Sequence, residues 1–152
     1  MTGGAAHRAV ERLEELYPGV WALGHDADLA FEAEGATLEQ LFDRAAQGMM
    51  VLLQEAPGAG PAEEERALAL EADDAPALLA AWLRELLYLY EAHGLEYRGA
   101  GFEEMDGRRM RARVWLGRAG RPAVRELKGV TYHALTVERG PAGWRAQVVF
   151  DV

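Results

Sequence analysis

Two long segments with apolar residues at helical spacing set the strongest limit on how this chain folds. The first covers residues 37–54, where Thr37 and Gln40 form a capping-box pattern in which the Gln40 side chain can bond to the Thr37 amide. The second follows Asp73 and Asp74, either of which can cap a helix, and ends at His93-Gly94. Each segment has one wide apolar side, made by Leu38, Leu41, Phe42, Ala45, Met49 and Leu53 in the first and by Leu78, Leu79, Trp82, Leu83, Leu86, Leu87 and Tyr90 in the second.

The segments around these helices predict strands and one further short helix. Residues 5–16 place Val10, Leu13 and Leu16 on one side of a short helix. Residues 27–34 and 67–72 each predict a strand. Asp106-Gly107 predicts a hairpin between strands 102–105 and 109–116, and a second hairpin joins strands 130–138 and 144–152. The sequence therefore predicts one α+β domain, with two main helices packed on a mainly antiparallel sheet and an extra N-terminal helix within residues 1–20.

Composition excludes several kinds of chemistry. The chain has 152 residues and no cysteine, and no serine occurs, which excludes disulfides, thiolate metal sites and both cysteine and serine nucleophiles. The net charge of −9 opposes strong direct binding of RNA, because a phosphate backbone repels such a surface. No apolar run is long enough to span a membrane and no secretory signal is evident, so we expect a cytoplasmic protein.

Acidic residues at two predicted strand ends are candidate metal ligands. In His25-Asp26-Ala27-Asp28 the two aspartates share one face of the strand, and carboxylates so placed can bind calcium or magnesium. Asp151 lies one residue from the end of the sequence, where Val152 adds an α-carboxylate if the chain ends there naturally. If the first and last strands are neighbours, Asp28 and Asp151 could meet. The simpler interpretation is that these acids are solvated.

Basic residues suggest two further sites. Lys128 is the only lysine among 16 basic residues, and it could neutralise a phosphate or pair with a partner's carboxylate. His133 could be a ligand or a proton carrier, although a lone strand histidine is more often structural. The stretch 108–128 holds half of the basic residues, so it is either an RNA track or, as we favour, an exposed hairpin face balanced by acids. This basic stretch comprises Arg108, Arg109, Arg111, Arg113, Arg118, Arg121, Arg125 and Lys128, and the candidate acids are Glu63, Glu64, Glu65, Asp73 and Asp74.

Taken in order, these segments resemble the archease family over residues 21–152. His25-Asp26-Ala27-Asp28 is similar to the family's His-Thr-Ala-Asp motif, with Asp26 in place of the threonine. The two helical segments, Lys128 with residues 130–133, and the ending 148–152 complete the resemblance. Residues 1–20 exceed the short start that is usual in the family, so we treat them as an extension.

The resemblance implies a protein cofactor rather than an enzyme. Archeases assist the GTP-dependent RNA ligase that joins 3′-phosphate or 2′,3′-cyclic phosphate ends to a 5′-hydroxyl in tRNA splicing, by promoting ligase guanylylation and multiple turnover. The resemblance implies a calcium site at Asp28, Asp151 and Val152 and roles in activation for Lys128 and His25. Asp26 departs from the family's threonine and adds a negative charge, which makes it a candidate for an extra ligand. It implies no nucleotide site of the chain's own and only indirect contact with RNA.

Two other functions remain open from the residues. One is a metal-dependent phosphoester hydrolase in which Asp26, Asp28 and Asp151 hold the metal and His25 or His133 carries the proton. The other is a chaperone-like or RNA-binding module that uses the arginine hairpin, for which RNA binding should weaken steeply with salt.

Overall fold

The computed structural model describes residues 11–24, 29–54, 60–132 and 134–152. The elements in chain order are β1 (Arg12–Tyr17), β2 (Val20–Leu23), β3 (Leu29–Gly35), α2 (Leu38–Gln54), β4 (Glu64–Glu71), α3 (Ala75–His93), β5 (Leu95–Met105), β6 (Arg109–Arg118), β7 (Gly129–Val130), β8 (Thr136–Gly140) and β9 (Gly143–Asp151). Neither α2 nor α3 is long and apolar enough to cross a membrane.

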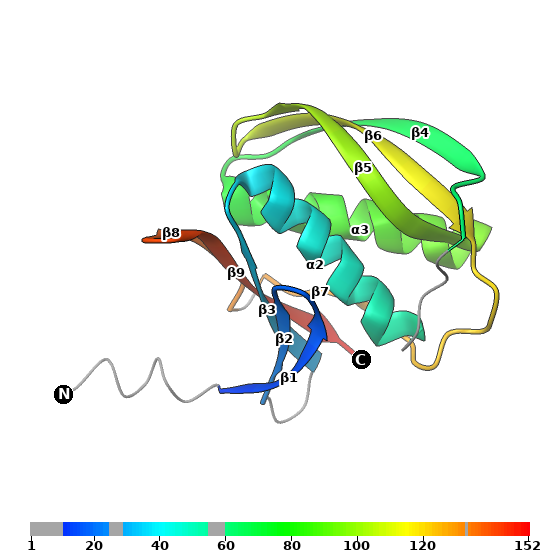
Figure 1. Cartoon of the computed structure of the whole chain (residues 1–152), viewed down its shortest axis with the longest axis horizontal. Coiled ribbons are helices and arrows are strands. Elements are labelled where there is room, and N and C mark those ends of the chain that lie inside the picture. Colours follow the sequence, from blue (N-terminus) through cyan, green and yellow to red (C-terminus); the bar gives the residue numbers. More distant parts are fainter. Residues whose placement is uncertain (1–10, 25–28, 55–59, 133) are drawn as a thin grey trace.

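The strands form two antiparallel sheets, and the two helices lie between them (Figure 1). In the larger sheet the order is β1, β2, β3, β9, and the far side of β9 pairs with both β8 and β7. The smaller sheet has the order β4, β6, β5. The predicted α+β class, the two main helices and the antiparallel pairing are confirmed. The strands nevertheless form two sheets instead of one: the strands near the two ends of the chain make the larger sheet, and the middle strands β4, β5 and β6 make the smaller one.

Local hydrogen bonds explain where the helices begin and end. At α2, the Gln40 amide donates to Thr37 Oγ1 at 3.1 Å, while Gln40 Oε1 accepts from the Ala36 amide rather than from the predicted Thr37 amide. At α3, Asp74 Oδ1 accepts from the Ala77 amide at 2.9 Å. Gly94 ends α3 with φ +66°, a left-handed conformation that glycine adopts without steric cost.

We expect Asp74→Ala to lower the free energy of unfolding by about 1 kcal/mol, because the variant leaves an amide of the first α3 turn without its side-chain acceptor. Asp73→Ala is the matched control, since Asp73 is the exposed acidic neighbour and α3 uses Asp74 as its cap. Its effect should stay within about 0.5 kcal/mol. Urea unfolding of both variants measures the difference, and equal losses would contradict the assignment of Asp74 as the cap.

The prediction of an N-terminal helix is wrong for the residues of this segment that the structure describes. Residues 12–17 form strand β1, which pairs with β2, a strand that the sequence did not predict. Arg12 forms ion pairs with Glu32 and Glu34 of β3, the second at 2.8 Å, and its guanidinium lies 3.8 Å from the centre of the Trp21 ring. These long-range contacts favour a strand over the helix that the local pattern predicted. The apolar side of that helix would include Leu13, which is 63% exposed and contributes little burial. The predicted residues 5–10 lie outside the described residues.

The predicted strand 130–138 is two strands. β7 contains only Gly129 and Val130, and β8 begins at Thr136. Between them the Leu135 amide donates to Tyr132 O at 3.2 Å, and Ala134 has φ +62°, which a continuous strand does not allow. The hairpin between β8 and β9 is nevertheless present.

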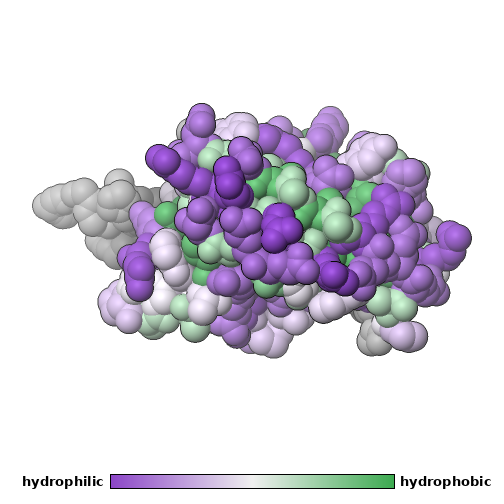
Figure 2. Space-filling view, turned by 90° about the horizontal axis from the view of Figure 1, so that it is seen from above, coloured by the Kyte–Doolittle hydropathy of each residue, from purple (hydrophilic) through white to green (hydrophobic). Residues whose placement is uncertain are grey.

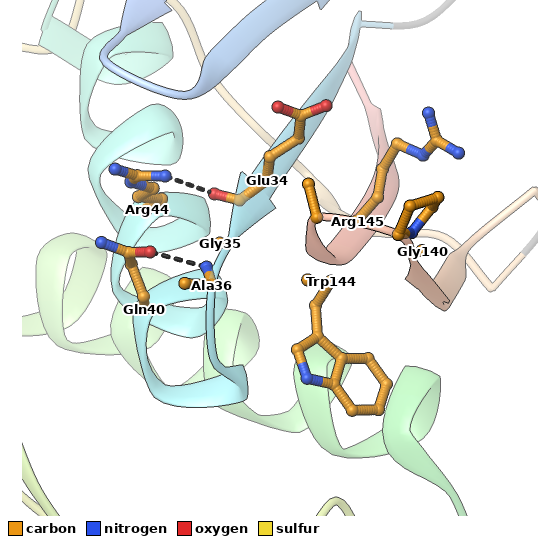
Figure 3. Close-up of a pocket in the computed structure, with 11 residues that line it drawn as sticks. Glu34, Gly35, Ala36, Gln40, Arg44, Gly140, Trp144 and Arg145 are labelled. Atoms are coloured by element: carbon orange, nitrogen blue, oxygen red, sulfur yellow. Dashed lines mark hydrogen bonds between the residues drawn. The ribbon is translucent and has the colours of Figure 1, made fainter.

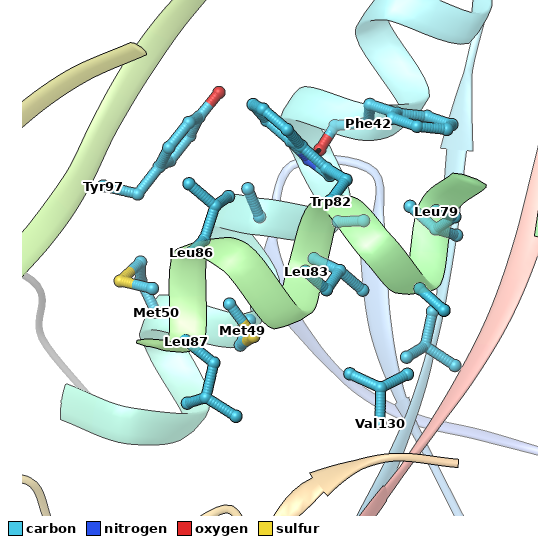
Figure 4. Close-up of a cluster of buried hydrophobic side chains, with 14 of the residues drawn as sticks. Phe42, Met49, Met50, Leu79, Trp82, Leu83, Leu86, Leu87, Tyr97 and Val130 are labelled. Atoms are coloured by element: carbon cyan, nitrogen blue, oxygen red, sulfur yellow. Dashed lines mark hydrogen bonds between the residues drawn. The ribbon is translucent and has the colours of Figure 1, made fainter. Parts of the chain in front are cut away.

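One apolar core fills the space between the sheets (Figure 4). The larger sheet contributes Phe31 of β3 and Phe150 of β9, whose ring centres are 5.5 Å apart. The smaller sheet contributes the predicted inward row of β6, whose four residues are at most 2% exposed: Met110, Ala112, Val114 and Leu116. Because Phe31 and Phe150 are fully buried, the core fixes β3 and β9 side by side, and this pairing positions the candidate site.

Candidate functional site

Asp151 and Val152 lie where β9 leaves the core. Val148, Val149 and Phe150 are at most 1% exposed, whereas Asp151 is exposed and Val152 is 48% exposed. The buried residues therefore hold the end of the strand in place, while the Asp151 carboxylate reaches solvent. In that position the carboxylate is available to a cation or to a partner protein.

Lys128 lies beside Asp151. A backbone hydrogen bond joins these two residues, both of which the sequence predicted for the site. The Lys128 amide donates to Asp151 O at 2.8 Å, and β7 then pairs Gly129 with Asp151 and Val130 with Phe150. The flanking residues Leu127 and Val130 are buried, at 0% and 4% exposure, whereas Lys128 is exposed. Its ammonium group is thus on the surface next to the end of β9.

The start of β3 lies at the same end of the sheet. Leu29 is paired with Phe150, so the residue that follows Asp28 in the sequence is opposite the residue that precedes Asp151. The predicted residues His25, Asp26 and Asp28 lie outside the described residues, as does His133. The described part of the chain therefore contains Asp151, Val152 and Lys128 of the predicted site.

Metal-ligating side chains are sparse in the described residues. Within residues 11–24, 29–54, 60–132 and 134–152, no group of three or more His, Asp or Glu side chains is arranged to hold an ion. Asp151 contributes carboxylate oxygen, the donor that calcium and magnesium prefer. A metal site at this end of the sheet would need further oxygen donors beside Asp151.

The long loop before Lys128 is anchored to the end of α2. The Val124 amide donates to Leu53 O at 2.7 Å, and Arg125 Nη1 donates to Leu52 O at 2.6 Å. The last turn of α2 contains no basic residue, so Arg125 supplies a cation to carbonyl groups that the helix leaves unpaired. Arg125, predicted as part of the basic stretch, thus stabilises the loop that leads to Lys128.

Arg84 of α3 also contacts this region, and sequence reasoning missed it. Its guanidinium donates to Tyr132 Oη at 2.8 Å and to Val130 O at 3.2 Å. Tyr132 was noted only as part of the matching segment. The partners lie 46 and 48 residues from Arg84, so no local pattern in the sequence could have paired them.

The basic stretch is mainly an exposed face with local ion pairs, as we favoured. On β6, Arg113 pairs with Glu103 at 3.0 Å and with the predicted Glu65 at 3.3 Å. Arg111 pairs with Glu104 and Arg109 with Glu71, two acids that were not among the candidates. The candidates Glu64 and Asp74 have other partners, which are Arg66 and the α3 cap.

This face is the outer surface of the smaller sheet, where hydrophilic side chains surround a few apolar ones (Figure 2). Trp115 lies in the outward row of β6, where its indole N–H donates to Glu65 at 3.2 Å. Its ring covers Gly99 and Gly101 of β5, so packing explains its partial exposure. The acids paired with Arg109, Arg111 and Arg113 offset the positive charge that would attract a phosphate backbone to this face.

A pocket of about 410 Å³ lies at the other end of β3, between the start of α2 and the β8–β9 turn (Figure 3). Arg44 Nη1 donates to Glu34 O at 2.9 Å, and Gln40 accepts from the Ala36 amide at 2.7 Å. These side chains bond to the backbone of the pocket's own wall, so they stabilise the turn between β3 and α2. The pocket is at the opposite end of β3 from Asp151 and adds nothing to the site there.

Comparisons with known proteins agree with this fold. The model of the Archease protein family (MTH1598/TM1083) matches residues 21–152. A protein archease of Methanosarcina acetivorans is 35% identical over 137 residues, covering 86% of this chain and 93% of that protein. The solution structure of Methanobacterium thermoautotrophicum protein 1598 has a TM-score of 0.67 at 24% identity, covering 90% of this chain and all of that one. A Thermotoga maritima crystal structure, described as an archease and possible chaperone, has a TM-score of 0.60 at 20% identity, covering 84% and 93%. The chain belongs to the archease family.

Proposed function

We propose that this archease is a metal-binding protein cofactor of a GTP-dependent RNA ligase. The ligase would join RNA 3′-phosphate or 2′,3′-cyclic phosphate ends to 5′-hydroxyl ends, as in tRNA splicing. The archease would promote guanylylation of the ligase and allow it to complete many turnovers. Family membership supports the proposal, and so does the exposed Lys128, whose amide is bonded to the end of β9.

The observation that carries the proposal is the strand register at this end of the larger sheet. Leu29 is opposite Phe150, and the Lys128 amide is bonded to Asp151 O. This register supports a site, which we call the tip, formed by Asp28, Asp151, Val152 and Lys128. Carboxylates brought close together repel one another, and a cation relieves that repulsion.

The donor chemistry fits a hard cation. Asp28 and Asp151 offer carboxylate oxygens, and Val152 adds its α-carboxylate where the chain ends at that residue. With no thiolate in the chain, calcium is a better fit than a soft metal. Asp26 would add negative charge near the ion, and His25 would lie at the edge of the tip. The ion would supply fixed positive charge, and the exposed Lys128 ammonium would attract a phosphate or a partner's carboxylate.

Multiple-turnover RNA ligation tests the proposal directly. The ligase of the same organism is supplied with manganese, GTP and excess RNA, with and without substoichiometric archease. We expect the archease to raise the number of turnovers. Lys128→Ala should lower that stimulation about tenfold or more, a loss typical of a residue that stabilises charge at a reaction site. Arg109→Ala is the control, because Arg109 is an exposed cation on the outer face of the other sheet.

An active ligase that gains no turnovers from wild-type archease would contradict the proposed function. Stimulation by Lys128→Ala at the wild-type level would instead remove Lys128 from the mechanism. Hydrolysis of a phosphodiester by the purified archease, without any ligase, would favour the metal-dependent hydrolase.

A further inference from the structure

Arg84 reaches from α3 to the segment that follows Lys128. One guanidinium nitrogen donates to the Tyr132 hydroxyl at 2.8 Å, and another donates to the backbone oxygen of Val130 at 3.2 Å. The guanidinium carbon lies 4.5 Å from the centre of the Tyr132 ring. A single side chain therefore holds both the backbone and a side chain of this segment.

Val130, which is 4% exposed and packed in the apolar core, anchors the middle of this segment, whereas Lys128 and Tyr132 on either side of it are exposed. β7 is two residues long, and its neighbouring amides form two bonds to β9, from Lys128 to Asp151 O at 2.8 Å and from Thr131 to Val149 O at 2.9 Å. Tyr132 is 58% exposed, so burial in the core does not fix its ring. Because Lys128 and Tyr132 are exposed on either side of the buried Val130, the ends of this segment can open locally at a lower free-energy cost than the core.

We propose that Arg84 is a positioning residue that clamps residues 128–132 against α3 and thereby sets where Lys128 presents its ammonium group. The proposal rests on the proposed function of the tip. Within the described residues, the hydrogen bonds of the Arg84 guanidinium are to Tyr132 and Val130 rather than to Lys128 or Asp151. It acts through Val130 and Tyr132, which continue the chain from the lysine.

The geometry requires arginine rather than any cation. The planar guanidinium makes two hydrogen bonds in different directions and contacts an aromatic ring, which a lysine ammonium cannot reproduce. Arg84→Lys is therefore the critical variant, because it keeps the charge and loses the clamp. If Arg84 acted instead by attracting an acidic partner, lysine would substitute for it.

Amide hydrogen exchange tests the clamp without any ligase. In Arg84→Ala and Arg84→Lys, the Thr131 and Lys128 amides should exchange about tenfold faster than in the wild type, since a charged hydrogen bond and a cation–π contact are lost. The Gly94 amide, which donates to Tyr90 O at the end of α3, should be unchanged. Tyr132→Phe keeps the ring and should give a smaller effect. Unchanged exchange at Thr131 and Lys128 would overturn the clamp.

Ligation then tests whether the clamp matters for activation. Both Arg84 variants should lower the maximal number of turnovers about tenfold, while the archease concentration for half-maximal stimulation stays within about twofold of the wild type. Full stimulation by Arg84→Lys, or a rise in the half-maximal concentration alone, would overturn the positioning role. If wild-type archease stimulates no ligation, the proposed function fails, whereas the exchange experiment still decides the clamp.

Discussion

Asp151→Ala is expected to remove calcium binding and the stimulation of the ligase together, and Asp28→Ala is expected to do the same. Each variant deletes one of the carboxylates that the proposed tip provides. With so few ligands, losing one should weaken calcium binding by about 100-fold or more. Asp151→Ala should still fold, because its side chain is exposed and its backbone oxygen still accepts the Lys128 amide.

Calcium titration of the thermal unfolding temperature measures binding independently of the ligase. A ligand that binds only the folded state at 100 times its dissociation constant adds about 2.7 kcal/mol of stability, so the wild type should show a clear shift. Asp73→Ala is the control, as it removes an exposed acid just before the start of α3 and leaves strand β9 unchanged.

The variants also separate two uses of the metal. Loss of the calcium shift with full ligation would mean that the ion stabilises the tip but has no part in activation. If both variants keep the calcium shift and the full stimulation, the metal site at Asp28 and Asp151 is wrong.

The helices could be predicted from the sequence because their signals are local. Thr37 and Gln40 lie within one helical turn of the start of α2, and Asp74 and Gly94 mark the two ends of α3. The inward row of β6 was predicted for a similar reason, since neighbouring strand residues face opposite sides of a sheet.

Features that depend on distant partners could not be predicted in this way. β1 is held by contacts between Arg12 and residues about 20 positions later, and these overrode a helical pattern. The pairing of β3 with β9, which places the candidate site, joins residues more than 100 positions apart. From the residues alone, this pairing was only an assumption under which Asp28 and Asp151 could meet. The chain's resemblance to archeases then favoured it. No local sequence pattern indicated that Arg84 contacts Val130 and Tyr132.

Trp82→Ala is expected to destabilise the fold more than any of the other substitutions, by about 3–5 kcal/mol. Trp82 is fully buried, and its ring lies 5.8 Å from that of Tyr97 and 5.5 Å from that of Phe102. Its indole N–H donates to Phe42 O at 2.9 Å, so one side chain joins α3 to α2 and to the smaller sheet (Figure 4). Alanine would leave a cavity where these elements meet.

Urea unfolding compares this variant with Tyr88→Ala, which removes an aromatic ring from the exposed side of the same helix. Tyr88 is 55% exposed, so its loss should cost no more than about 1 kcal/mol. Trp82→Phe should fall between the two, since it keeps a ring and loses the hydrogen bond to α2. Because native domains are stable by only about 5–15 kcal/mol, Trp82→Ala should leave a measurable unfolded fraction near physiological temperature. If Trp82→Ala lowers the free energy of unfolding no more than Tyr88→Ala does, other core residues must hold α3 against α2 and the smaller sheet.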